Sequence, residues 1–533
     1  MENHQDNTPH SFTTYYGSID DEWSAASSTV ASSSSSSLSC LSSIHNDEPP
    51  KYTSGYANKQ ASPELKKSLS AFTTFGLAFS NIGIFANTSA TFQTVLQRGG
   101  PVSALLGWNI VAIMAIAISL SLAEICSVFH TSGGLYVWVY ELLNRHPKAK
   151  KHAAFVSVAT GFLYTMSLII GIAATDVSIA LSAGSLLKII TGHGLSHTMV
   201  LCLTLVIVMS QAVLNGRHTH LLNVLNKLNV FWSCAGLILV VIVLSFFVKD
   251  HQDPVWVFTH YENETGFDSP YYVFVLGMIG AAYSMSGSES SASMSEETEN
   301  AAMASPIAMV TSIITAWIFG FIYLLALLFS IQDMDAVLNT TFNLPVAQVF
   351  IDAVGRSVTI GFLILMVVCQ YSSGSAALTV SSRMVYAMAR DGGTPYHRQL
   401  SQLNDQQIPG NAVFATFLLA VGVVLPYPLS DHLFVVIISA ATITIYSTYA
   451  VALGCKLFMG MGGKKGPFQL GPFSKPITAL AFAWSLFTVV AFTLPTSWPI
   501  DAANTNYAGP ALCVLMLITY CMLSFTSLST DEL

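Results

Sequence analysis

The chain has 533 residues, of which 52% are hydrophobic and only 9% are charged, and its mean hydropathy is +0.57. A soluble domain carries about 25% charged residues, so this composition argues against a soluble protein and indicates helices that lie in lipid. The net charge of −8 comes without a dense basic patch, so we expect no nucleic-acid partner. The eight cysteines are scattered without the spacing of a zinc site, and we expect no metal and no cofactor.

The first part of the chain differs from the rest, because it is polar and includes the serine run 33–37. Such a segment cannot bury enough apolar surface to become ordered. We therefore expect a disordered, Ser-rich cytoplasmic tail over residues 1–65. A transmembrane domain over 66–527 and a short cytoplasmic C-terminus over 528–533 are predicted to follow it.

Long apolar stretches fill the predicted transmembrane domain. A helix needs about 20 apolar residues to cross the roughly 30 Å of hydrocarbon in a bilayer. Because the stretches are continuous and not alternating, they indicate helices and not a β-barrel. The sequence thus predicts an all-α polytopic membrane protein with about twelve spans, near 70–92, 103–128, 153–183, 198–215, 228–248, 271–292, 305–330, 357–388, 411–428, 431–456, 477–495 and 507–527.

Positive charges give the predicted orientation, since Lys and Arg accumulate on the cytoplasmic side of a membrane. With the N-terminus inside, the 21 Lys and Arg all lie on that side except Arg98, Lys188, Lys249 and Arg356. Two glycosylation sequons, at Asn263 and Asn339, lie on the opposite side. We expect both termini in the cytoplasm of a plasma-membrane protein, with the vacuolar membrane as the alternative.

The first and the sixth spans contain glycine and small polar residues at membrane depth. Irregular backbone is tolerated there only around a cavity, and broken helices in corresponding positions of two halves indicate a substrate site. The two spans are those that a five-plus-five inverted repeat requires. The other interpretation is a packing glycine with serines bonded back to the helix. The predicted substrate-binding residues are Asn81, Gly83, Ala86, Asn87 and Thr88 in the first span and Ser286, Gly287, Ser288 and Glu289 in the sixth.

Acidic side chains inside spans are the candidates for coupling or gating, because an ionisable residue in a membrane is functional by default. They are Glu289, Asp176 in the third span and Glu124 near the inner end of the second, where a loop base could pair with it. We expect Tyr164, Gln370 and Tyr371 to hold helices together.

An acidic run, 295–300, follows the sixth span. It is either a solvated helix end or a partner for Arg383 or Arg390 that holds an inward gate.

Three segments carry a family resemblance: SLAEICSVFHTSGGLYVWVYEL (121–142), SGSESSASMSEETENAAMASPIAM (286–309) and SSRMVYAMARDGGTP (381–395). In them the chain resembles the amino acid–polyamine–organocation superfamily, specifically the fungal permeases for GABA, other amino acids and choline, from about residue 68 to 527. The resemblance implies a permease with a leucine-transporter-type core whose spans one and six are unwound. It also implies proton-coupled uptake as a symporter, by alternating access and without enzymatic chemistry.

The sequence departs from the family at 287–293, where it has GSESSAS and many relatives have Gly-Tyr-Asp-Ala-Ser-Ala-His. Loss of the aromatic residue at position 288 removes a cation–π face and favours an amino acid with a free amine near Glu289.

We therefore expect a secondary permease for a small amino acid or a GABA-like zwitterion, whose partners are that solute, protons and the lipid bilayer. A choline or polyamine permease is the alternative, and a transporter-like nutrient sensor is the alternative from another class. An enzyme is not expected, because no nucleophile–base pair, metal cluster or P-loop is present.

Overall fold

The structure is a computed structural model that describes residues 70–528, except 218, 249, 405–407, 430–432 and 501–504. All described elements are helices, and they belong to one compact unit, Lys51–Leu533. The predicted tail, 1–65, and the predicted C-terminus apart from Leu528 lie outside the described residues.

Nine helices of the described chain are long and apolar enough to cross a membrane. They are α4 (Gly100–Val128), α6 (Ala153–Thr191), α7 (His197–Arg217), α8 (Thr219–Phe246), α13 (Ala301–Phe329), α15 (Val346–Arg390), α17 (Gly410–Val424), α18 (Leu433–Met459) and α19 (Ser474–Thr493). The apolar helix α20 (Ala508–Leu528) follows them at the position of the last predicted span. Each of these helices coincides with a predicted span.

The first and the sixth predicted spans are broken helices. The first consists of α2 (Ala71–Ile82) and α3 (Ile84–Leu96). The sixth consists of α10 (Pro270–Gly277), α11 (Ile279–Ser284) and α12 (Ser290–Ser293), with η2 (Ser295–Glu297) after it. The all-α prediction with about twelve spans is confirmed, and each five-span half begins with an interrupted helix.

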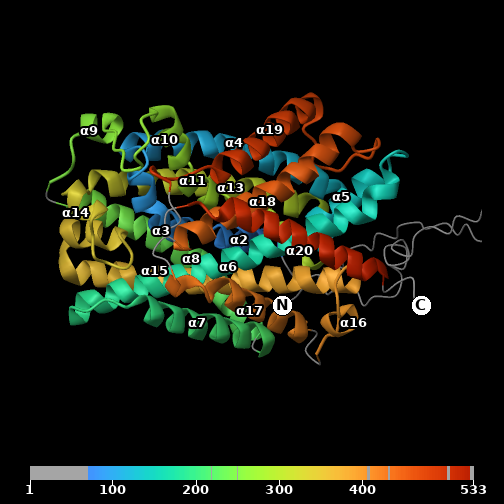
Figure 1. The fold of residues 1–533 in the computed structure, drawn as a ribbon, viewed down its shortest axis with the longest axis horizontal. Coiled ribbons are helices and arrows are strands. Elements are labelled where there is room, and N and C mark those ends of the chain that lie inside the picture. The colour runs from blue at the N-terminus through green and yellow to red at the C-terminus, as the bar shows by residue number, and fades with distance from the viewer. Residues whose placement is uncertain are drawn as a thin grey trace, which may run out of the picture. The chain divides into compact units, whose positions relative to one another are not determined.

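Short elements connect the spans at the two ends of the helical bundle (Figure 1). The helices α9 (Pro254–Thr259) and α14 (Met334–Leu338) lie at one end, while α5 (Leu135–Asn144) and α16 (His397–Leu400) lie at the other. The remaining short elements are η1 (Lys150–His152), η3 (Tyr427–Leu429) and η4 (Gly471–Phe473).

Helix α15 begins before the predicted eighth span, because it includes a short helix in front of the membrane-crossing part. Gly355 separates the two parts with non-helical angles (φ 75°, ψ 175°). Glycine adopts a positive φ without the steric cost that a Cβ atom imposes. The apolar segment that the sequence predicts, 357–388, begins just after this kink.

The interior of the bundle is formed mainly by α6, which packs extensively against α15 and α18, and by α13 against α4. Large aromatic side chains such as Trp138, Tyr323 and Tyr446 are completely or almost completely buried there. Apolar side chains such as Phe231, Val206 and Leu517 are exposed on the outer surface. A continuous exposed apolar surface of this kind is what lipid contact requires.

Candidate functional site

The break in the first span is located at Gly83, which has left-handed backbone angles (φ 57°, ψ 43°). The turn leaves helix ends in the middle of the bundle, and these expose unpaired backbone groups. The Asn87 side chain satisfies one of them, since its Nδ2 donates to the Ile82 carbonyl at 2.8 Å. Among the described residues, no side chain caps the N-terminus of α3.

The break in the sixth span lies between Ser284 and Ser290, and Gly287 has a φ of 101° there. Two serines bond back to the chain: Ser290 Oγ donates to the Gly287 carbonyl at 2.7 Å, and Ser286 Oγ donates to the Tyr283 carbonyl at 2.9 Å. A third contact joins the two broken helices, because Asn81 Nδ2 donates to the Gly287 carbonyl at 3.2 Å.

Glu289 is 2% exposed and is held by two tyrosines from other spans. Tyr449 of α18 donates its hydroxyl to Oε2, and Tyr164 of α6 donates to Oε1 at 3.3 Å. The Tyr449 hydroxyl also accepts the Gly287 N–H at 3.4 Å. The carboxyl group is thereby fixed between three spans by neutral donors, without a basic partner among its described contacts.

A cavity of about 70 Å³ lies where these groups meet. Since one water needs about 10–15 Å³ on this measure, the cavity has room for about five water-sized groups. No Lys, Arg or His is among the described residues of its wall. Those residues are Asn81, Asn87, Ser167, Leu168, Gly171, Thr175, Tyr283, Ser286, Gly287, Glu289, Ala377, Ala441 and Ile445.

The structure brings five of the predicted substrate-binding residues together on the cavity wall: Asn81, Asn87, Ser286, Gly287 and Glu289. The other four, Gly83, Ala86, Thr88 and Ser288, do not line it. Ser288 is buried, and its carbonyl accepts a bond from Ser291 Oγ at 3.1 Å. The missing aromatic residue at position 288 therefore does not change the cavity wall, because Ser288 is not part of it. The wall does contain an aromatic residue, Tyr283.

The part of the wall that comes from α6, α15 and α18 could not be predicted from the sequence. Small or apolar residues such as Gly171, Ala377 and Ala441 carry no signal in a long apolar helix, because they resemble residues that pack between helices. Tyr164 was expected to hold helices together, and it does so through the carboxyl group of Glu289. In the sequence, Tyr164 could be recognised only as a polar residue within a long apolar run.

Asp176 lies outside the wall of the cavity, although its neighbour Thr175 is part of it. Successive residues of a helix point about 100° apart, and Asp176 turns toward α7 and α15. Gln211 Nε2 donates to Asp176 Oδ1 at 2.8 Å, and Asp176 Oδ2 is buried without a hydrogen-bond partner among the described residues. An added Cβ atom at Gly374 of α15 would come within 2.8 Å of Oδ1, so the carboxyl group is tightly enclosed.

Glu124 is paired with Lys456 at 2.7 Å, and both side chains are almost fully buried. The base comes from the last turn of α18 and not from a loop. Ser474 Oγ and the Leu470 N–H also donate to the Glu124 carboxylate, and Lys456 Nζ donates to the Ser121 carbonyl at 2.8 Å. This acid therefore ties α4 to α18 and to the start of α19.

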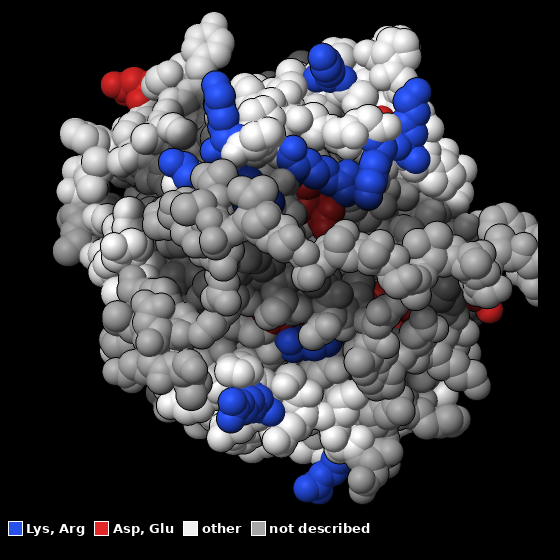
Figure 2. Space-filling view, turned by 90° about the vertical axis from the view of Figure 1, so that its right-hand side faces the viewer, with Lys and Arg blue, Asp and Glu red and all other residues white. Residues whose placement is uncertain are grey.

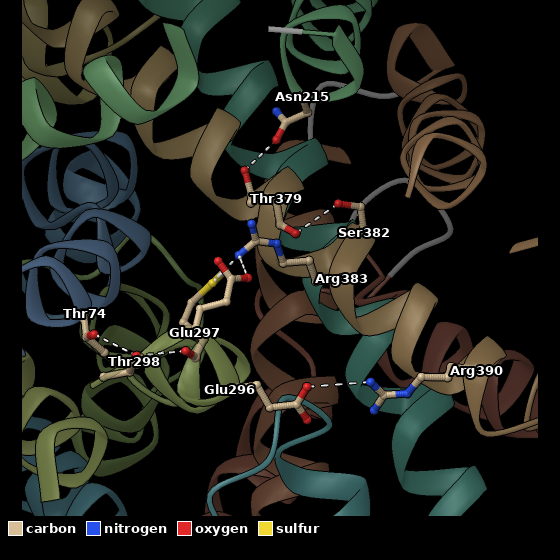
Figure 3. Close-up of polar contacts among 10 residues, drawn as sticks. Thr74, Asn215, Glu296, Glu297, Thr298, Thr379, Ser382, Arg383 and Arg390 are labelled. Atoms are coloured by element: carbon tan, nitrogen blue, oxygen red, sulfur yellow. Dashed lines mark hydrogen bonds and ion pairs between the residues drawn. The ribbon is translucent and has the colours of Figure 1, made fainter. Parts of the chain in front are cut away.

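The acidic run after the sixth span is paired with the end of α15 (Figure 3). Arg383 Nη1 lies 2.9 Å from Glu297 Oε1, and Arg390 Nη1 lies 3.6 Å from Glu296 Oε2. Beside them, the Thr74 and Thr298 hydroxyls share a 3.0 Å hydrogen bond between α2 and the sixth span. Of the two alternatives for this run, the structure shows the pairing with Arg383 and Arg390, which joins the end of the sixth span to α15.

Comparison with known proteins agrees with this architecture. The model of the amino acid permease family matches residues 69–519. An amino-acid permease BAT1 homolog of Oryza sativa subsp. japonica is 30% identical over 85% of this chain and 90% of its own length. The choline transporter of Saccharomyces cerevisiae is 28% identical over 85% of this chain and 79% of its own. The GABA-specific permease of the same yeast is 26% identical over 86% and 81%.

Proposed function

The chain belongs to the amino acid permease family, and from this premise we propose that it is a secondary transporter for a small amino acid or a GABA-like zwitterion. The observation that carries the proposal is the buried, tyrosine-held carboxylate of Glu289 on the wall of a cavity between two broken helices. An acid in this position offers a charge for an ammonium group. The small volume of the cavity favours a small solute.

The two ends of a zwitterion find different partners in this cavity. Asn81 and Asn87, which lie on either side of the break at Gly83, line the cavity and offer amide N–H groups to a carboxylate. Glu289 lies at the break of the other helix and suits the ammonium end. Because no described residue of the wall is basic, the substrate carboxylate relies on the amides of Asn81 and Asn87.

Proton coupling is the second part of the proposal, and Asp176 is the acid that we favour for it. Its Oδ2 is buried and has no hydrogen-bond partner in the described part of the chain, so it has an open position for a proton. Glu124, in contrast, already has Lys456 and Ser474 as partners. Glu289 accepts hydrogen bonds from the hydroxyls of Tyr164 and Tyr449. In this proposal it is the acid of the substrate site that responds to proton binding.

The third part of the proposal is alternating access, which requires a gate at one end of the bundle. The ion pairs of Glu297 with Arg383 and of Glu296 with Arg390 close that end. Lys and Arg side chains gather on the same end face (Figure 2), which supports the orientation with this face in the cytoplasm. We propose the plasma membrane as the host, so that opening of the gate releases substrate into the cell.

A choline or polyamine carrier is the alternative, and one observation favours it. Glu289 is an acid bonded to Tyr164 and Tyr449 on a wall that also contains Tyr283, and such surroundings also suit an organic cation. We favour the zwitterion, because a cation has no carboxylate to accept the N–H groups of Asn81 and Asn87 on the wall.

Uptake of radiolabelled GABA, a panel of amino acids and choline into permease-deficient yeast tests the proposal. We expect saturable uptake of a zwitterion that rises when the external pH is lowered from 7 to 5. Uptake of choline alone would establish the organocation function, and uptake independent of pH would refute proton coupling. Absence of any uptake with the protein at the cell surface would contradict transport.

A further inference from the structure

The acid Asp176 of α6 and the amide of Gln211 of α7 form a pair in the interior of the bundle. Both side chains are 0% exposed, and Gln211 Nε2 donates to Asp176 Oδ1 at 2.8 Å. Gly374 of α15 closes a third side, because a Cβ atom added there would lie 2.7 Å from Nε2 and 2.8 Å from Oδ1. Neither residue of the pair lines the cavity of the substrate site.

Each member of this pair also has an oxygen atom without a partner. Asp176 Oδ2 and Gln211 Oε1 are buried and form no hydrogen bond with any described residue. Such atoms are rare in folded proteins, because an unpaired buried oxygen loses its hydrogen bonds to water and gains none. Here they belong to two groups that already share one hydrogen bond. A single proton between the two oxygens would satisfy both of them.

The surroundings of Asp176 do not compensate a negative charge. Among the described residues, no Lys, Arg or His forms an ion pair with it. The titratable group that faces it from another span is Tyr283 of α11, and a tyrosine is neutral at physiological pH. From α7 and α15 it meets the neutral residues Gln211 and Gly374. An isolated carboxylate is very costly in such a place, whereas the protonated acid is not.

We propose that Asp176 is protonated while the gate is closed and that its proton bridges Asp176 Oδ2 and Gln211 Oε1. A protonated carboxyl group has one O–H donor, and an amide oxygen accepts it. With Nε2–H donating to Oδ1 and Oδ2–H donating to Oε1, the acid and the amide close a ring of two hydrogen bonds. Gln211 is then a positioning residue that holds the coupling proton. The inference rests on the proposed function and adds to it the partner of the proton.

A buried water is the other way to satisfy the two oxygens, since one water donates two hydrogen bonds. It would, however, leave the charge of the carboxylate without a counter-ion. We favour the proton, because it removes the charge and fills both unpaired positions at once.

The pair is connected to the helix of the gate through Asn215. Its Nδ2 atom donates to the carbonyl groups of Gln211 at 2.9 Å and Ser375 at 3.3 Å. Thr379 Oγ1 donates to Asn215 Oδ1, one helical turn before Arg383 on α15 (Figure 3). Loss of the proton would set two acceptor oxygens of the pair against each other, so the ring would open. We expect this opening to disturb the contact of α7 with α15 beside the gate.

Infrared difference spectra of the full-length purified protein at pH 7 test the ring directly. A protonated carboxyl group shows a C=O stretching band, whose frequency falls when the carbonyl oxygen accepts a hydrogen bond. We expect Asp176→Asn to remove one such band. Gln211→Leu should move it to higher frequency, because the N–H donor to Oδ1 is gone. Gln370→Leu is the matched control and should leave the band in place, since this buried amide of α15 is bonded to Ser178 and Ser182.

Uptake of radiolabelled GABA and alanine at pH 7 and pH 5 gives the functional readout. Gln211→Glu keeps the length of the side chain, but its ring needs a second proton before both hydrogen bonds can form. We expect its uptake to be about tenfold below that of the wild type at pH 7, roughly the size of one lost hydrogen bond. At pH 5 its uptake should approach the wild-type value. Gln370→Leu should keep the wild-type ratio between the two pH values.

Three results would overturn the ring. The first is a spectrum from which Asp176→Asn removes no band of a protonated acid, as expected for an ionised acid bridged by water. The second is a band that Gln211→Leu does not move. The third is an equal defect of Gln211→Glu at both pH values, which would make Gln211 a packing residue only. A wild-type protein that shows the band but transports neither GABA nor alanine would instead contradict the proposed function.

Discussion

Glu289 is the residue at which the two broken helices and the third and tenth spans meet. Each of its oxygens accepts a hydrogen bond from a tyrosine hydroxyl. These neutral donors use part of its hydrogen-bonding capacity, and no basic side chain among its described contacts pairs with it. An acid at this depth is expensive to maintain in a membrane protein. The two tyrosine hydroxyls therefore stabilise the buried acid and still leave it available to a ligand.

Replacing Glu289 by Gln should preserve the shape of the site and remove the charge. We expect uptake to fall roughly 10- to 100-fold, since hydrogen bonds to charged groups are worth about 1.5–3 kcal/mol. The measurement is the initial rate of uptake divided by the amount of protein at the cell surface. Glu299→Gln serves as the control, because Glu299 is an exposed acid in the segment after the same span. Unchanged KM and maximal rate in Glu289→Gln would remove this residue from the site.

At the scale of elements, the broken helices depend on the glycines at which they are interrupted. A Cβ atom added to Gly287 would lie 2.8 Å from Asn81 Nδ2, and the φ of 101° disfavours any side chain. Gly83 is less constrained, because the nearest atom to an added Cβ there is 3.6 Å away. Gly287 is therefore the position at which the two breaks are in closest contact.

Gly287→Ala should displace Asn81 and weaken the contact between the first and sixth spans. We expect a loss of stability of about 1–3 kcal/mol, as for a residue held in a sparsely populated backbone conformation, together with reduced uptake. Thermal unfolding of the purified protein in detergent measures the first effect. Gly361→Ala is the matched control, because an added Cβ atom meets nothing within 4 Å there. Equal melting temperatures for the two variants would contradict the close contact at Gly287.

The gate is the second feature at this scale, because it joins the sixth span to α15 through charge. Arg383→Glu should repel Glu297 and cut uptake by about tenfold or more. The double variant Glu297→Arg/Arg383→Glu should recover part of the activity, because the opposite charges face each other again. Such a recovery isolates the pairwise interaction from the effect of each single change.

Arg398→Glu provides the gate control, since Arg398 is exposed on the short helix α16. Uptake by this variant should equal that of the wild type. A double variant no more active than Arg383→Glu alone would show that the 2.9 Å pair does not hold the gate.

At the scale of the whole molecule, a buried ion pair holds the second, tenth and eleventh spans together. Lys456 and Glu124 are 2.7 Å apart, and their remaining polar atoms are bonded to Ser121, Leu470 and Ser474. A buried pair is costly to form but even more costly to break, because one unpaired charge remains in an apolar interior. The pair therefore holds these three helices in one arrangement at their common end.

Glu124→Gln should destabilise the protein by about 3–5 kcal/mol, the usual cost of breaking a buried pair. Replacing both partners, with Glu124→Gln and Lys456→Met, should cost less than Glu124→Gln alone, because no charge is left unpaired. The free energy of unfolding in a denaturant titration measures both changes. The partly exposed pair of Glu141 and Arg145, 2.8 Å apart, is the control, and Glu141→Gln should change stability by about 1 kcal/mol or less. A double variant less stable than Glu124→Gln would contradict this account.

The sequence alone determined the number and type of the spans and the positions of both helix breaks. These features are visible in the sequence because each membrane crossing needs about 20 apolar residues, and every backbone polar group there needs a hydrogen-bond partner. Gly83 and Gly287 therefore stood out among apolar residues. The acidic run 295–300 and its arginine partners were also visible, since charges are rare in such a chain.

Only the tertiary structure decided which faces of the spans meet. A helix of a soluble protein marks its buried face by an apolar stripe, but a membrane helix is apolar on all sides. For this reason the sequence could not show that Thr175 lines the cavity while Asp176 turns to Gln211. Nor could it show that Tyr449 and Tyr164 hold Glu289, or that Lys456 pairs with Glu124. These contacts join residues far apart in the chain, and packing of the spans against one another creates them.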